Sequence, residues 1–145
     1  MDEIEKRILN HLGKKGRDSY REIARSIDVS PATVMKRIRA MEKQGIITGY
    51  RPVIDYDKLG YDFFVMVDVR VAKGKLQQIE KKIARNPSVV SVYDNTGSFD
   101  TTVMARFKNR ASLDRFIKRL QTYDFVERTE TKLILNTIKD GLLRL

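Results

Sequence analysis

The hydrophobic positions in residues 19–45 repeat with the period of an α-helix and predict two short helices. Ser30 followed by Pro31 is typical of a helix start, because a serine oxygen can accept a free backbone N–H and proline needs no partner. Gly45 is typical of a helix end. The apolar positions are Ile23 and Ile27 on the first helix, and Val34, Ile38 and Met41 on the second.

The opposite face of the second helix is small near its start and cationic further along. Small side chains let the start of a helix enter the major groove, and Lys and Arg reach base edges and phosphates. The face therefore predicts a DNA-recognition helix, although helix periodicity alone fits an ordinary solvated surface helix as well. Arg37, at its margin, could instead pair with an acid such as Glu22 or Glu42. The predicted DNA-binding residues are Ser30, Ala32, Thr33, Lys36, Arg37, Arg39 and Lys43.

A further helix is predicted at residues 2–12, where apolar residues recur every four positions. With the two helices above it makes a three-helix DNA-binding domain over residues 1–45. Residues 46–60 include a β-prone run but contain Pro52, which removes a ladder donor. We expect this segment to be a connecting strand and hinge.

Beyond residue 60 the apolar pattern predicts an alternation of strands and helices. The order is β-α-β-β-α-β, so residues 61–145 are expected to form a ferredoxin-like domain and the whole chain is α+β. The first strand is apolar on both faces. Phe64 and Met66 fall on the face that helices would leave uncovered, and we expect a homodimer through it. The strands are expected at 61–71, 88–94, 99–107 and 125–138, and the helices at 74–85 and 110–121.

The amino-acid composition gives the chain a positive charge and argues against several kinds of site chemistry. The 145 residues carry a formal net charge of +10, which favours a polyanionic partner. There is no Cys, and the single histidine, His11, is expected to be inert on a helix flank. We therefore expect no catalytic residue, metal or cofactor. No apolar run reaches 18 residues, so we expect no membrane span and a cytoplasmic protein.

Four stretches resemble the Lrp/AsnC family of feast/famine regulators: EIARSIDVSPATVMKRIRAMEKQGIITGY, IDYDKLGY, the predicted order of elements, and TGSFD. The resemblance implies a regulator of transcription that binds double-stranded DNA, dimerises through its C-terminal domain and often senses amino acids. It also implies assembly of dimers into octamers or other higher oligomers. Asp28 stands where the family usually has glycine in the turn. Since Asp tolerates positive φ, we expect the turn to survive.

The family's sensor turn corresponds to a segment that contains Gly97 and Asp100. Backbone N–H groups around Gly97 could take the carboxylate of a free amino acid, and Asp100 could take its ammonium group. A turn glycine followed by a strand aspartate fits the same residues without any ligand. The predicted effector-binding residues are Thr96, Gly97, Ser98, Phe99 and Asp100.

Two other functions remain open at this point. The chain could be an enzyme similar to the sirohaem decarboxylases, but that resemblance would implicate C-terminal histidines, and residues 52–145 contain none. It could also be an architectural protein that coats DNA without a specific operator, which the charge permits.

Overall fold

The computed structural model describes residues 1–145 and divides them into two compact units. The first comprises Met1–Ile54 together with Ile138–Leu145, and the second comprises Asp55–Thr137. We call them the helical unit and the sheet unit. The predicted α+β class is confirmed. None of the helices combines the length and the apolar content needed to cross a bilayer.

The helical unit contains α1 (Glu3–Leu12), α2 (Tyr20–Ile27) and α3 (Pro31–Lys43). Side chains just before each helix fix where it begins. Asp2 and Ser19 each form a reciprocal capping box with a glutamate three residues later. The Ser30 oxygen accepts the N–H of Thr33 at 3.1 Å, as its position before proline predicts. The stripes predicted from periodicity form one core: Ile8, Ile23, Ala24, Ile27, Val34, Ile38 and Met41 are all buried.

The turn between α2 and α3 depends on Asp28. This residue has φ 54° and ψ 58°, and it is the one non-glycine residue of the chain with positive φ. Its N–H donates to Ala24, and the N–H of Val29 donates to the same carbonyl at 3.1 Å. The expected tolerance of aspartate at this position is confirmed, and the turn closes α3 against α2.

Replacing Asp28 is expected to separate conformational strain from other effects. Asp28→Gly should raise the free energy of unfolding by about 0.5 kcal/mol, because loss of the left-handed penalty is partly offset by glycine's larger entropy loss. Asp28→Val should lower it by about 1–2 kcal/mol, since a β-branched residue tolerates this conformation poorly. Denaturant unfolding followed by circular dichroism measures both. Equal stabilities for the two variants would contradict the strain.

The strand expected within residues 46–60 is wrong, because no strand forms there. The segment is irregular apart from a short 3₁₀ helix, η1 (Asp57–Leu59), which Gly60 ends with φ 74°. A strand needs a neighbour to complete its hydrogen bonds, and this segment has none within the chain; Pro52 in addition lacks an N–H. Tyr50 anchors part of it to α3, donating its hydroxyl to Glu42 at 2.9 Å.

The sheet unit has the predicted β-α-β-β-α-β order. Its four strands are antiparallel to their neighbours in the order β2-β3-β1-β4. The last strand ends five residues earlier than expected, at Leu133 rather than 138. Its pairing stops where Ile134 donates to the Phe64 carbonyl at 2.8 Å, since β1 begins at Phe63. The elements are β1 (Phe63–Val71), α4 (Leu76–Ala84), β2 (Val89–Asp94), β3 (Thr101–Phe107), α5 (Arg110–Gln121) and β4 (Val126–Leu133).

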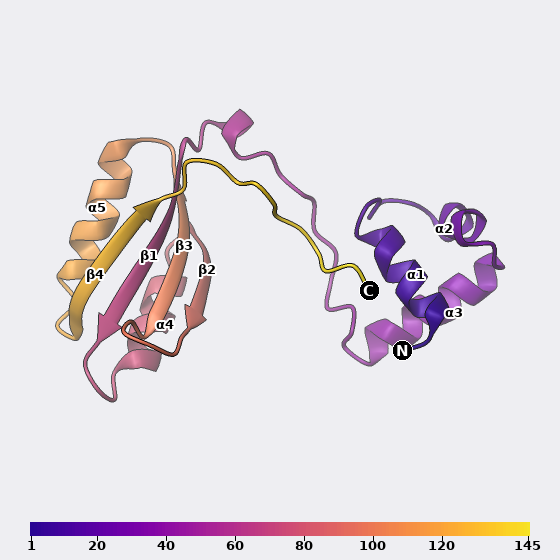
Figure 1. Ribbon diagram of the computed structural model, residues 1–145, viewed down its shortest axis with the longest axis horizontal. Helices are drawn as coiled ribbons and strands as arrows, with labels where there is room; N and C mark the ends of the chain where they lie inside the picture. Colours follow the sequence, from indigo (N-terminus) through magenta and orange to yellow (C-terminus); the bar gives the residue numbers. More distant parts are fainter. The chain divides into compact units, whose positions relative to one another are not determined.

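Both helices of the sheet unit cover the same face of the sheet (Figure 1). Ile79 of α4 and Phe116 of α5 belong to one core with alternate residues of β1 and β3. The opposite face carries no helix. Phe64 and Met66 lie there as predicted, beside Met104 of β3, and all three are only partly buried. The buried valines beneath the helices are Val65, Val67, Val69, Val71 and Val103.

The last residues differ from the expected division, which placed them with the C-terminal domain. Residues 138–145 group with the helical unit. The Asn10 amide of α1 donates to the Leu145 carbonyl at 2.7 Å and accepts its N–H at 3.0 Å. Leu142 lies close to Gly13, where an added Cβ would come within 3.0 Å of its Cδ1. Local patterning cannot reveal such a contact, because the partners are far apart in sequence.

Candidate DNA-binding surface and effector pocket

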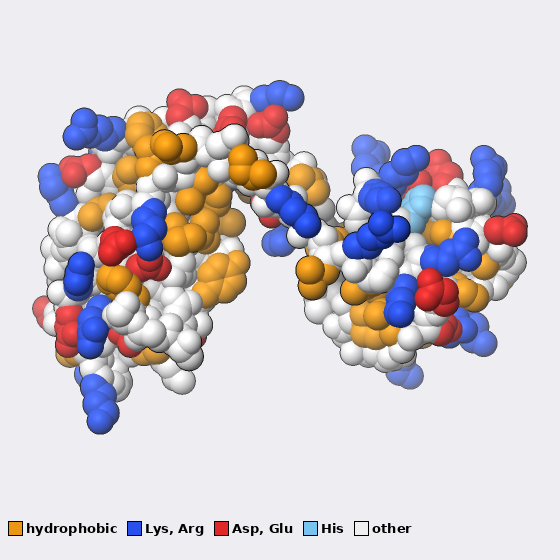
Figure 2. Space-filling view, viewed as in Figure 1, with side chains coloured by type: hydrophobic (Ala, Val, Ile, Leu, Met, Phe, Trp, Pro, Cys, Tyr) orange, Lys and Arg blue, Asp and Glu red, His pale blue; other side chains and the backbone are white.

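One face of α3 is exposed and cationic. Lys36, Arg39 and Lys43 recur with helical spacing after Ala32, at i, i+4, i+7 and i+11, so the four share one stripe. All four are exposed, while the opposite stripe of the same helix is buried in the core. We call these four residues the recognition stripe. Its small first member and its long cationic members have the arrangement predicted from sequence. Figure 2 shows Lys and Arg side chains over the surface of this unit.

Ser30 and Thr33 stand at the start of α3 beside the recognition stripe. Their hydroxyl oxygens lie 2.8 Å apart, and Ser30 also caps the helix. Ser30 is exposed and Thr33 is partly exposed, so each retains a surface that a DNA backbone can approach. Their local role is structural, since they fix the first turn whose N–H groups point outward.

Arg37 differs from the other predicted DNA contacts. Its guanidinium pairs with Asp2 at 2.7 Å and with Glu5 at 3.3 Å, and so fastens α3 to the start of α1. The sequence allows an ion pair of Arg37 with Glu22 or Glu42, but the partners are instead acids more than 30 residues earlier. Glu5 is almost fully buried, so Arg37 supplies the charge that stabilises it. We therefore assign Arg37 to the packing of the helical unit.

His11 is also structural. Its Nε2 lies 2.8 Å from the Asp18 carboxylate, and its Nδ1 lies 2.7 Å from the Ser26 hydroxyl. The Ser26 hydroxyl donates to the Ile23 carbonyl at 2.9 Å. The imidazole thus links α1 to α2 and to the loop between them. Both ring nitrogens are within hydrogen-bonding distance of a partner, and neither partner belongs to the recognition stripe.

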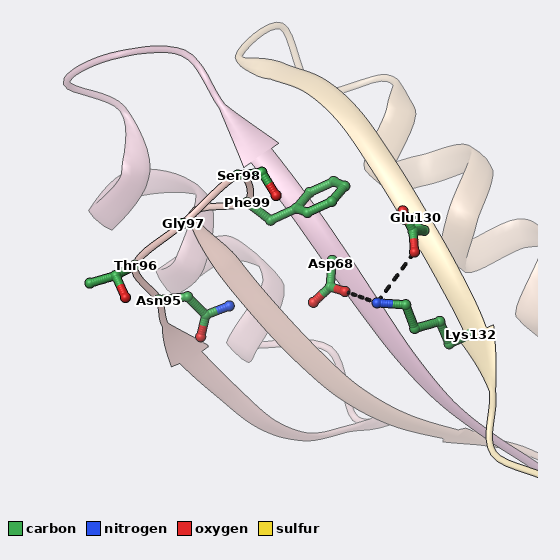
Figure 3. A pocket seen from close by; sticks show the side chains of 8 residues that line it. All are labelled: Asp68, Asn95, Thr96, Gly97, Ser98, Phe99, Glu130 and Lys132. Atoms are coloured by element: carbon green, nitrogen blue, oxygen red, sulfur yellow. Dashed lines mark hydrogen bonds and ion pairs between the residues drawn. The ribbon is translucent and has the colours of Figure 1, made fainter.

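The sheet unit has a hollow of about 680 Å³ at the β2–β3 turn (Figure 3). Four of the five predicted effector residues line it: Thr96, Gly97, Ser98 and Phe99. None of the backbone N–H groups of residues 96–99 donates to another backbone carbonyl, and Gly97 has φ 116°. Consecutive unpaired N–H groups form an anion-binding concavity. This arrangement suits the carboxylate of a small ligand.

Asp100 does not line the hollow. Its carboxylate accepts the N–H of Val71 at 2.7 Å, and its own N–H donates to Val69 at 3.0 Å. It therefore fastens the turn to the end of β1, which corrects the expectation that it takes a ligand ammonium group. The polar residues that sequence reasoning missed are Asp68, Asn95, Glu130 and Lys132.

Asp68 and Lys132 form the charged floor of the hollow (Figure 3). The Lys132 ammonium lies 2.6 Å from Asp68 and 3.3 Å from Glu130. Burial works to raise the pKa of Asp68, but hydrogen bonds from Lys132 and Thr102 outweigh it and lower that pKa below 3.8. The hydrogen bonds to Asp68 and Glu130 raise the pKa of Lys132 above 10.5. The pair is therefore charged over the whole physiological range.

These pKa shifts predict a pH dependence of stability. A carboxyl group whose pKa is lowered by folding stabilises the fold above its unfolded value, near 3.8, and loses that contribution as pH falls further. The raised pKa of Lys132 gives a contribution that is present below 10.5 and lost above it. Asp68→Asn should flatten the loss of stability below pH 4 relative to the wild type, measured by thermal unfolding. Parallel acid profiles would contradict the pairing.

Comparison with known proteins finds one family model for each part of the chain. The family model described as the winged helix-turn-helix DNA-binding domain matches residues 1–48, and the Lrp/AsnC ligand binding domain matches residues 63–143. An uncharacterized HTH-type transcriptional regulator of Pyrococcus abyssi is 38% identical over 97% of this chain and 95% of its own length.

Solved structures show the same fold. The structure of E. coli AsnC superposes with a TM-score of 0.91 and 26% identity, over 100% of this chain and 99% of that one. A Neisseria meningitidis transcriptional regulator solved as a complex with L-Met gives a TM-score of 0.90 at 22% identity, over 97% and 94%. The two family models and the regulators among the relatives identify the chain as a transcriptional regulator. The chain belongs to the Lrp/AsnC family.

Proposed function

We propose that this DNA-binding regulator reads its operator through the recognition stripe of α3, helped at the helix start by Ser30 and Thr33. The exposure of three cations on one stripe, opposite a fully buried stripe, is the observation that carries this assignment. None of the three has a carboxylate within 4.0 Å, in contrast to Arg37 on the same helix. Their charges are thus available for phosphates and base edges.

We further propose that the chain acts as a homodimer joined through the uncovered sheet face, and that such dimers assemble into octamers or other higher oligomers. Phe64, Met66 and Met104 lie on that face with no helix over them, and Tyr93 of β2 is 54% exposed. A sheet that is apolar on both faces is stable when both are covered. A second copy supplies a matching surface by two-fold symmetry.

A charge placed on the uncovered face tests this dimer. Met66→Asp is expected to convert the dimer to a folded monomer, because an unpaired carboxylate would be buried between two sheets. Sedimentation velocity gives the assembly state, and circular dichroism confirms that the fold is retained. Gln77→Asp, which adds the same charge at an exposed position of α4 on the other side of the sheet, serves as the control. An unchanged assembly of the Met66→Asp variant would remove this face from the interface.

We propose a small amino acid as the effector of the hollow at residues 96–99. The unpaired N–H groups supply a place for its carboxylate, and the acids Asp68 and Glu130 surround a single ammonium, that of Lys132. L-Met in the Neisseria regulator is a precedent for an amino acid in a related fold. Calorimetry with each of the twenty amino acids tests the assignment. No heat from any of them would remove the effector claim.

The regulatory function itself is tested by selecting fragments of the source genome that the protein binds, with and without amino acids. A regulator enriches a few promoters by a large factor over bulk DNA. An architectural protein would prefer its best fragment by only a few-fold.

The proposed site contains no nucleophile–base pair and the sheet unit contains no histidine, so we propose no enzymatic activity. Because the protein would act on the chromosome, we propose a cytoplasmic location.

A further inference from the structure

The outward faces of α4 and α5 carry exposed cations that no acid of the chain neutralises. Lys118 is the exception, since it pairs with Asp114 at 2.8 Å. Lys82 places its ammonium 4.0 Å from the Tyr123 ring centre. The remaining cations have no carboxylate within 4.0 Å, so their charge is presented to solvent. We call them the helix-layer cluster: Lys81, Arg85, Arg110, Arg115 and Arg119.

Most cations on the opposite sheet face lie close to an acid of the chain. Lys132 pairs with two acids, and Arg70 lies 3.4 Å from Glu127. Arg106 lies 3.8 Å from Asp57, and its guanidinium packs 3.9 Å from the Phe64 ring centre. That face pairs most of its cations with acids of the chain, with Arg128 as the exception, whereas the helix layer pairs only Lys118. The general basic composition of the protein does not explain this contrast.

The spacing of the helix-layer cluster costs stability. Lys81 and Arg85 are four residues apart, as are Arg115 and Arg119, and like charges at this spacing repel. The helix dipole offsets the cost at the helix ends, where Arg85 and Arg119 stand. It does not do so for Arg110, which occupies the first position of α5, where positive charge is unfavourable. A polyanion outside the chain would relieve the repulsion within both pairs and the unfavourable charge of Arg110 at the helix start.

The two helices form one continuous layer. They pack on the same sheet face through a shared core that includes Ile83 of α4 and Leu120 of α5, so their outward faces look the same way (Figure 1). An array of separated cations across two helices matches a run of backbone phosphates better than a single small anion. We propose that the helix-layer cluster binds the phosphate backbone of duplex DNA that flanks the operator.

This second contact rests on the proposed function, because it assumes that α3 holds the protein on DNA. It carries no sequence information, since phosphates are the same at every base pair. It increases affinity and salt dependence and leaves the choice of operator to the recognition stripe. Flanking DNA would then be held along the sheet unit of each protomer.

The salt dependence of binding tests the proposal. We would compare the full-length wild type with Arg115→Gln/Arg119→Gln and with a charge-matched control, Lys58→Gln/Lys139→Gln, whose positions lie outside the helix layer. Each protein is titrated with a duplex that contains only the operator and with one extended by flanking sequence. On the extended duplex the slope of log K against log salt should weaken by about 0.9 for each phosphate that the variant no longer binds, roughly 2 per engaged protomer.

The operator preference of the double variant should stay unchanged, and circular dichroism verifies its fold. Equal slopes for variant and wild type on the extended duplex would overturn the proposal, as would an equal loss in the charge-matched control. Binding to vesicles of anionic lipid that the variant loses, with unchanged DNA slopes, would assign the layer to membranes and also overturn it. A last result would separate the two proposals: the wild type binds all genomic fragments equally well, yet the slope on bulk duplex is still weaker for the variant. In that case the proposed operator function fails and the helix-layer contact stands.

Discussion

Replacing Lys36 and Arg39 together by alanine is expected to weaken operator binding by at least about 30-fold. The two side chains are exposed, unpaired and on one stripe of α3, so neither supports the fold. Removing a base contact costs about 1–3 kcal/mol, and removing a phosphate contact weakens the salt slope by about one unit. Fluorescence anisotropy with operator and bulk duplexes measures both quantities.

The two contacts differ in what their removal does to binding. If Arg39 contacts a base, Arg39→Ala alone should relax the choice of sequence; if it contacts a phosphate, binding should fall evenly on all sequences. Arg7→Ala/Lys14→Ala removes the same charge from exposed positions on and after α1 and serves as the matched control. Equal losses for the two double variants would mean that net charge, and not the recognition stripe, drives binding.

Ile38→Ala is expected to unfold the helical unit while the sheet unit stays folded. Ile38 is 1% exposed and lies where α3 meets the core of this small unit. Truncating such a side chain costs about 2–5 kcal/mol, which is comparable with the whole stability of a unit of this size. Thermal unfolding should resolve an early loss of helix, and operator binding should disappear without any change in the assembly state.

Met35→Ala on the same helix is the control, because Met35 is only partly buried and should cost less. The separate cores of the two units predict this uncoupled behaviour. One cooperative transition for wild type and Ile38→Ala alike, with the sheet unit lost at the same temperature, would contradict it.

Local patterns were sufficient to predict the recognition helix. Val34, Ile38 and Met41 repeat with a period set by helix geometry, so the exposed face follows directly once the buried face is known. The Asp28 turn was predictable for the same reason, since backbone sterics act on a single residue.

Features that join distant residues were not predictable in this way. Arg37 finds Asp2 and Glu5 through the crossing of α3 and α1, which no local pattern specifies. Asp68 meets Lys132 only because β1 and β4 pair in a register that places Asp68 opposite Glu130. Charged residues alternate along β4 in the sequence, but only the strand register decides which residues of β1 lie beside them and form the pocket. Residues 46–60 form no strand for a similar reason, because a strand needs a hydrogen-bonding neighbour that the local sequence does not reveal.

Hydroxyl-radical footprinting of a selected operator tests the central claim most directly. A dimer that presents two copies of α3 should protect two patches centred about one helical turn of DNA apart, or a multiple of it. Lys36→Ala/Arg39→Ala should erase both patches at a concentration where the control variant still shows them. A single asymmetric patch, or protection that survives the loss of both side chains, would show that α3 does not read the operator in the way its exposed face requires.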